Sequence, residues 1–210
     1  DWVTSNTQKG DLFWYDGEWC WKGNTSSDEF VGHVLGLSLF HDLAATPEER
    51  RDVAATLGRI LDRIIGCGYL ICDLDGLPTD DGHFDPDFME NDFRALLGDA
   101  GLNSAMILGG LRAAHHVTGE RRFLEAFDYL ARERNYQENV RRIEAINTAY
   151  HLNHDSEEMA FLAMYTLMRL ETDAALWAVW REGLEGLWQA RRAERDPELN
   201  MIYAALGRAD

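Results

Sequence analysis

The sequence predicts an all-α fold made of antiparallel helical hairpins, and two observations lead to that prediction. Apolar residues recur every three or four positions in eight segments, and short polar connections separate these segments. Capping residues, prolines and glycines mark where most of the segments begin and end. We therefore expect the 210 residues to form one helical domain.

The first 24 residues are the exception, because their aromatic residues and glycines follow no helical period. This aromatic N-terminal segment is expected to form an ordered loop or hairpin. The first helix then starts from the polar stretch 25–29, which supplies an N-cap and an acidic first turn, and runs to about Ala44. Thr46 and Pro47 start the second helix, which should end near Gly66.

A small β-hairpin excursion is expected at 69–84, because a short apolar run there precedes the turn signal Asp75-Gly76. Residues 85–99 are interpreted as an irregular acidic loop. The remaining helices are expected at 105–117, 121–134, 137–150, 155–170 and 173–193, with a short last helix after Pro197.

Small residues distinguish some of these helices from the others. Gly32, Gly36, Gly109, Gly110, Ala113 and Ala114 should allow close packing on all sides. Their helices are therefore predicted to be the inner helices of an (α/α) toroid or a partial toroid. The more charged helices at 47–66, 120–134 and 173–193 would form its outer ring.

Composition excludes several classes of protein. The net charge of -17 would repel a phosphate backbone, so no nucleic-acid partner is expected. No apolar run approaches the roughly 18 residues that suggest a membrane span, so we expect a soluble, globular chain with no membrane partner. The three cysteines include no C-x-x-C pair, which indicates neither a disulfide scaffold nor a zinc knuckle.

The chain begins at Asp1, which fits a processed export product, a cloned fragment or a piece of a longer polypeptide. A secreted or periplasmic location is slightly favoured over a cytoplasmic one. The oligomeric state is left open by the sequence.

In a toroid the N-terminal ends of the inner helices meet at one mouth. That arrangement would bring Asp28 and Glu29 close to Asn103 and to residues 153–158. Carboxylates gathered around a cleft are what glycosidic cleavage requires, and a histidine would serve an epimerase or a lyase equally well. The predicted catalytic residues are Asp28, Glu29, His33, His154, Asp155 and Glu157.

Substrate binding is predicted for Trp19, Trp21, Asn103, Asn153 and Glu158, since tryptophan faces stack on pyranose rings and polar groups bind hydroxyls. Two purely structural interpretations stay open. The acids at helix starts can be ordinary caps. The aromatic segment can simply pack against the helices.

Metal binding is considered and not predicted. The pairs Glu29/His33 and His154/Glu158 each lie one turn apart, but their spacing matches no recognised metal signature. The aspartates at 73–87 fail the EF-hand pattern and are expected to form a solvated acidic loop. The pair His115-His116 near a helix end is interpreted as favourable contact with the helix dipole. No metal and no cofactor are therefore expected.

Three segments carry a resemblance to a known group of proteins: 21–29, the helix from Gly101 to Gly119, and 153–158. Together they resemble the (α/α) barrels of six-hairpin glycosidases and of related sugar epimerases and polysaccharide lyases. The resemblance implies a sugar-related activity and a carbohydrate or small-molecule substrate. The chain departs from the pattern because eight helices make four hairpins instead of six.

Two hypotheses about function result. The first is a carbohydrate-active enzyme that acts on a glycan or a uronate by carboxylate and histidine acid–base chemistry, as a hydrolase or else as a lyase or epimerase. The alternative is a non-catalytic helical module that binds a glycan or a protein.

Overall fold

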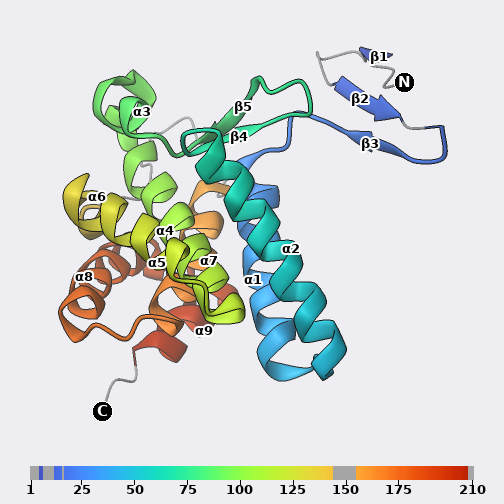
Figure 1. Ribbon diagram of the computed structural model, residues 1–210. Helices are drawn as coiled ribbons and strands as arrows, with labels where there is room; N and C mark the ends of the chain where they lie inside the picture. The colour runs from blue at the N-terminus through green and yellow to red at the C-terminus, as the bar shows by residue number, and fades with distance from the viewer. Residues whose placement is uncertain (1–4, 7–11, 16, 144–154, 208–210) are drawn as a thin grey trace.

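The computed structural model describes residues 5–6, 12–15, 17–143 and 155–207, and most of these residues are helical (Figure 1). Short π-helical turns follow α3 at Ala95–Asp99 and α5 at Tyr129–Glu133, and a 3₁₀ turn follows α8 at Arg192–Glu194. The α-helices are α1 (Ser27–Leu43), α2 (Pro47–Gly66), α3 (Pro86–Asn91), α4 (Ala100–Thr118), α5 (Arg121–Asp128), α6 (Tyr136–Arg141), α7 (Asp155–Arg169), α8 (Ala174–Arg191) and α9 (Pro197–Leu206).

Two small antiparallel sheets accompany the helices. One joins β1 (Ser5–Asn6), β2 (Leu12–Tyr15) and β3 (Cys20–Lys22), so the N-terminal segment contains strands. The other joins β4 (Leu70–Cys72) to β5 (Pro78–His83), which confirms the hairpin predicted between α2 and the later helices. Gly76 supplies the positive φ of 84° that its turn requires.

Helix α4 lies in the middle of the described helices (Figure 1). Its residues from Gly101 to Ala114 are all buried, and α1, α2, α5, α6 and α7 all pack against it. A Cβ at Gly110 would lie 2.7 Å from the Phe30 ring, so glycine there allows α1 to approach closely. The prediction that this helix packs on all sides is therefore confirmed.

The prediction about small residues on α1 is wrong. A Cβ added at Gly32 or Gly36 would meet no atom within 4 Å, so neither glycine serves close packing. The described helices also show no toroid. A toroid has a ring of inner helices, whereas α4 here occupies the centre of the bundle.

The predicted starts of α1 and α2 are confirmed by their caps. The Glu49 carboxylate accepts hydrogen bonds from the backbone N–H and the hydroxyl of Thr46, both at 2.8 Å, and Pro47 occupies the first turn. The Glu29 carboxylate accepts from the Ser26 N–H at 2.9 Å in the same way. Each glutamate thereby satisfies a donor that would otherwise lack a helical partner.

Residues 85–99 are more ordered than the expected irregular loop. Asp85 caps α3 by accepting from the Phe88 N–H at 2.9 Å, and Phe88 and Met89 are buried in the core. Gly98, inside the π-helical turn Ala95–Asp99, has a φ of 138° and kinks the chain just before α4. The helix expected at 137–150 begins at Tyr136 and ends at Arg141, earlier than predicted, and residues 144–150 fall outside the described residues.

A buried ion pair fixes α4 to the turn between α7 and α8. Arg112 donates to Glu171 at 2.7 Å, and Glu171 also accepts from the backbone N–H groups of Thr172 and Asp173 at 2.8 Å each. The indole N–H of Trp180 donates to the other Glu171 oxygen at 3.1 Å. Because the Glu171 side chain is fully buried, these four donors replace the water that it has lost.

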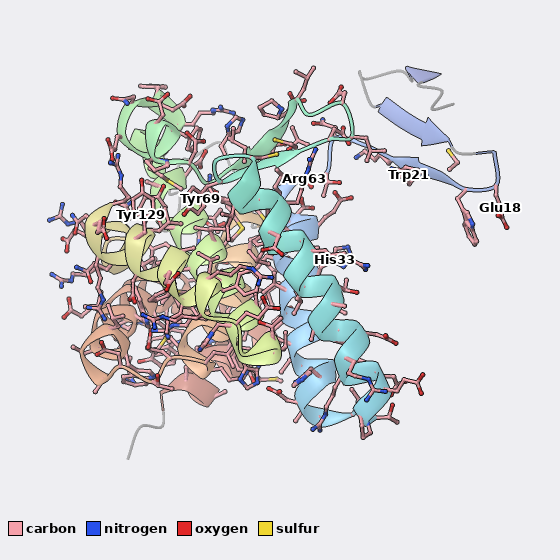
Figure 2. All side chains as sticks on the ribbon, viewed as in Figure 1. Glu18, Trp21, His33, Arg63, Tyr69 and Tyr129 are labelled. Atoms are coloured by element: carbon pink, nitrogen blue, oxygen red, sulfur yellow. The ribbon has the colours of Figure 1, made fainter. Side chains whose placement is uncertain are left out.

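Stacking between tyrosines joins the β4–β5 hairpin to the region that follows α5. The rings of Tyr69 and Tyr129 stack with centroids 6.0 Å apart, and both residues lie near the top of the bundle in Figure 2.

Within the part of the chain that the structure describes, no helix has the length and apolar character that crossing a bilayer would require.

Candidate active site

A cleft of about 510 Å³ lies where the N-terminal ends of α1, α4 and α7 meet. The β5 strand and residues 94–99 complete its wall. Most of the side chains around it are polar, and these are Lys22, Asn24, Ser26, Ser27, Asp28, Asp81, His83, Arg94, Asp99, Asn103, Asp155 and Ser156, with Phe88, Leu102 and Met159 as apolar members. The cleft therefore gathers residues that lie more than 130 positions apart in the sequence.

Asn24 positions the segment that carries Asp28. Its backbone N–H donates to Asp73 at 2.7 Å, and its side chain both donates to the Asp80 carboxylate at 3.0 Å and accepts from the Asp80 N–H at 2.9 Å. These bonds attach the start of α1 to the β4–β5 hairpin. Asn24 also has a φ of 52°, a conformation that asparagine tolerates better than most residues.

Asn103 holds the floor of the cleft against the end of β5. Its side-chain amide is almost buried and donates to the His83 carbonyl at 2.9 Å. The ring of His83 stacks on Phe88 with centroids 5.3 Å apart, and the guanidinium of Arg94 lies 5.0 Å from the same Phe88 ring. Asn103 also lines the cleft, and the oxygen of an asparagine amide can accept a hydrogen bond from a ligand hydroxyl.

Asp99 differs from the other cleft acids in its electrostatic environment. Partial burial is the largest effect that raises the pKa of Asp99, and the charges of Asp92 and Asp81 raise it further, although Arg94 opposes them. The side chain makes no capping hydrogen bond to α4, even though Asp99 lies at the start of that helix. Asp99 therefore binds a proton more readily than a fully exposed aspartate does.

The charges around the cleft are unequal. Four aspartates line it, whereas the basic side chains that line it are Lys22, Arg94 and His83. Arg94 is already paired with Asp92 at 3.3 Å. This excess of carboxylates disfavours a strongly anionic ligand.

The structure brings three of the predicted site residues together. Asp28 and Asp155 are exposed at the cleft, and Asn103 lies beneath them. They come from α1, α7 and α4 respectively, so three distant helix starts do share one rim. Their chemical roles remain predictions.

Other predicted residues lie away from the cleft lining. Glu29 turns back to its own helix start, as described above. Glu157 is buried and forms an ion pair with Arg191 of α8. The charge of Glu157 is therefore balanced within the pairing of α7 and α8. Glu158 is exposed and faces a shallow hollow next to Asp196 and Glu198.

His33 faces a different surface. It lines an apolar groove of about 320 Å³ between α1 and α2, together with Ile60 and Ile64 (Figure 2). Trp21 lies on β3, which extends away from the helices in Figure 2, and Trp19 is 67% exposed just before that strand. Neither tryptophan lines the cleft. Asn153 and His154 fall outside the described residues.

Sequence reasoning missed the wall formed by residues 81–99. Asp81, His83, Phe88, Arg94 and Asp99 all line the cleft, although the segment was expected to be hairpin and acidic loop. A usable signal was present in Gly98-Asp99, because a glycine and an acid directly precede the start of α4 at Ala100. No family model, curated protein or solved structure matches the chain.

Proposed function

We propose that the chain is a carbohydrate-active enzyme that hydrolyses a neutral glycan in this cleft. One observation carries the proposal: an aspartate whose pKa is raised by burial shares a polar cleft with exposed carboxylates. Glycoside hydrolysis uses two carboxyl groups of that kind, one protonated and one ionised. Asp99 supplies the first, and Asp155 or Asp28 supplies the second.

The proposed reaction assigns each group a task. Asp99 donates its proton to the glycosidic oxygen as the bond to the anomeric carbon breaks. Asp155 or Asp28 acts on the opposite face of the sugar, either by activating a water molecule or by attacking the anomeric carbon directly. Asn103 and Ser156 accept hydrogen bonds from the ring hydroxyls and donate hydrogen bonds to them.

The lining of the cleft supports a carbohydrate as the substrate. A volume of about 510 Å³ lies within the roughly 300–1,000 Å³ of small-molecule sites. Hydroxyl, amide and carboxylate groups dominate its wall, and they match the hydrogen-bonding surface of a sugar. The excess of carboxylates favours a neutral glycan over a uronate, because a uronate carboxylate would be repelled.

The likeness to toroidal sugar enzymes remains a prediction. It agrees with the proposed substrate class, although the described helices show no closed (α/α) ring. Fold likeness alone is weak support for a reaction. The proposal therefore depends on the cleft residues.

The test is turnover by the full chain and by Asp99→Asn, Asp155→Asn and Asp28→Asn on a panel of neutral and uronate oligosaccharides. New reducing ends report hydrolysis, ultraviolet absorbance of an unsaturated uronate reports a lyase, and proton NMR of the sugar ring reports epimerisation. We expect hydrolysis of a neutral member. Loss of general acid catalysis in Asp99→Asn should lower kcat by about 10²–10⁴-fold.

Glu29→Gln and Glu158→Gln serve as controls, because both acids lie outside the cleft lining. Both controls should retain turnover. Full activity of all three cleft variants would refute the assignment of the site. Binding of an oligosaccharide without any product would instead support the alternative of a non-catalytic glycan-binding module.

A further inference from the structure

A second cluster of chemically active side chains lies at the other end of α1 from the cleft. His41 and Asp42 belong to the last turn of α1, and His116 belongs to the last turn of α4. Asp28 and Asp42 are about 21 Å apart along the axis of α1, at 1.5 Å per residue. The proposed sugar chemistry uses none of these three residues.

The three side chains converge on one carboxylate oxygen. Nδ1 of His41 lies 2.9 Å from Oδ1 of Asp42, and Nε2 of His116 lies 2.8 Å from the same oxygen. One ligand atom from each residue can be chosen so that all three atoms lie within 4.8 Å of one another. We propose that His41, Asp42 and His116 bind one divalent transition-metal ion such as Zn²⁺.

The donor set selects the class of metal. Two imidazole nitrogens and one carboxylate oxygen suit Zn²⁺ and its first-row neighbours, whereas Mg²⁺ and Ca²⁺ prefer oxygen ligands throughout. Three protein ligands leave a coordination position for water. The His116 side chain is 40% exposed, so solvent reaches the cluster.

Coordination requires the three ligand atoms to rearrange. Metal–ligand bonds of about 2.0 Å in a tetrahedral site place the ligand atoms about 3.3 Å apart. Each nitrogen therefore has to move about 0.5 Å further from Oδ1, and the two nitrogens, which lie within 4.8 Å of each other, have to reach the same spacing. Coordination requires the ring nitrogen that faces Oδ1 in each histidine to be unprotonated, so the ion takes the place of the hydrogen bond between each imidazole and the carboxylate.

The surroundings of the cluster hold it in place. Arg169 of α7 donates to the other oxygen of Asp42 and to the hydroxyl of Ser38 at 3.2 Å, which orients the carboxylate and directs Oδ1 toward the histidines. Both histidines also lie at helix C-termini, where the negative ends of the helix dipoles favour a cation.

Calorimetric titration of the full, chelator-treated 210-residue chain with Zn²⁺ tests the proposal. One saturable ion per chain is expected for the wild type. Both His116→Ala and His116→Gln should weaken binding by at least about 100-fold, because replacing a supporting residue alone typically costs 10–100-fold. Arg169→Met should weaken Zn²⁺ binding by about 10–100-fold, because Arg169 supports a ligand and is not itself one. Two replacements of His116 guard against a variant that fails to fold.

His33→Ala is the matched control, because His33 is an exposed histidine of α1 that lies outside the cluster. It should bind as the wild type does. Co²⁺ gives a second readout, since visible absorption bands of a nitrogen- and oxygen-ligated ion should form in the wild type and vanish in both His116 variants. Absence of saturable binding, or equal binding by the His116 and His33 variants, would overturn the proposal.

Discussion

Replacing Arg112 by methionine should destabilise the protein far more than removing a better-aligned ion pair on the surface. Arg112 and Glu171 meet at 2.7 Å with side chains that are 9% and 0% exposed. Arg122 and Asp62 form two hydrogen bonds, at 2.8 and 2.9 Å, but both side chains are almost half exposed. The comparison therefore separates the effect of burial from that of geometry.

The expected magnitudes follow from what each variant leaves behind. Arg112→Met leaves the Glu171 carboxylate buried without its counter-charge, which costs about 3–5 kcal/mol. The variant also loses the contact of the guanidinium with the Phe127 ring, whose centroid lies 3.9 Å away. Arg122→Met leaves Asp62 hydrated, so it should cost less than about 1 kcal/mol.

Urea denaturation followed by circular dichroism measures both variants. In thermal melts the Arg112 variant should lose roughly 6–20 °C in Tm, using about 2–4 °C per kcal/mol for a chain of this size. Glu171→Gln, which keeps the shape of the side chain, should lose less than Arg112→Met. Equal losses for Arg112→Met and Arg122→Met would refute the reasoning that burial determines the strength of this pair.

Two further predictions concern single residues of the cleft and the core. Asp99→Asn should raise Tm at neutral pH and leave it nearly unchanged in acid. The pKa of Asp99 is raised in the folded state, so the stability of the wild type falls as the pH rises through that pKa. Thermal melts at several pH values measure the effect, and an equal Tm difference at every pH would contradict it. Gly183→Ala should cost about 3 kcal/mol in urea denaturation, the upper end of the usual range for overpacking, because its Cβ would lie 2.2 Å from the Val140 carbonyl oxygen of α6. Gly36→Ala, whose Cβ would meet no atom within 4 Å, should instead stabilise by about 0.5–1 kcal/mol, and a similar loss in both variants would contradict the packing assigned to Gly183.

The sequence predicted local features well, since these depend on neighbouring residues. Caps and prolines placed the starts of α1 and α2, and Asp75-Gly76 placed the turn of the β4–β5 hairpin. The prediction that Asp28, Asn103 and Asp155 share a rim also agrees with their positions in the cleft. That agreement arises because each residue lies in the first turn of its helix.

Features set by distant contacts could not be predicted in the same way. Helix α3 has six residues, too few for a helical period, and it depends on burying Phe88 and Met89 against the rest of the core. The small residues of α4 indicated burial on all sides, which fits an inner helix of a toroid as well as the centre of a bundle. Glu157 pairs with Arg191, which lies 34 residues later, and no local sequence pattern signals this ion pair.

The most direct test of the central claim is to locate bound sugar on the protein. Backbone amide NMR shifts of Asp155→Asn, titrated with the neutral oligosaccharide that the wild type cleaves or binds best, map the contact surface. We predict shifts concentrated at Asp28, Asp81, Asp99 and Asn103. Shifts concentrated along the groove of His33 and Ile60, or at the exposed Trp19, would contradict it.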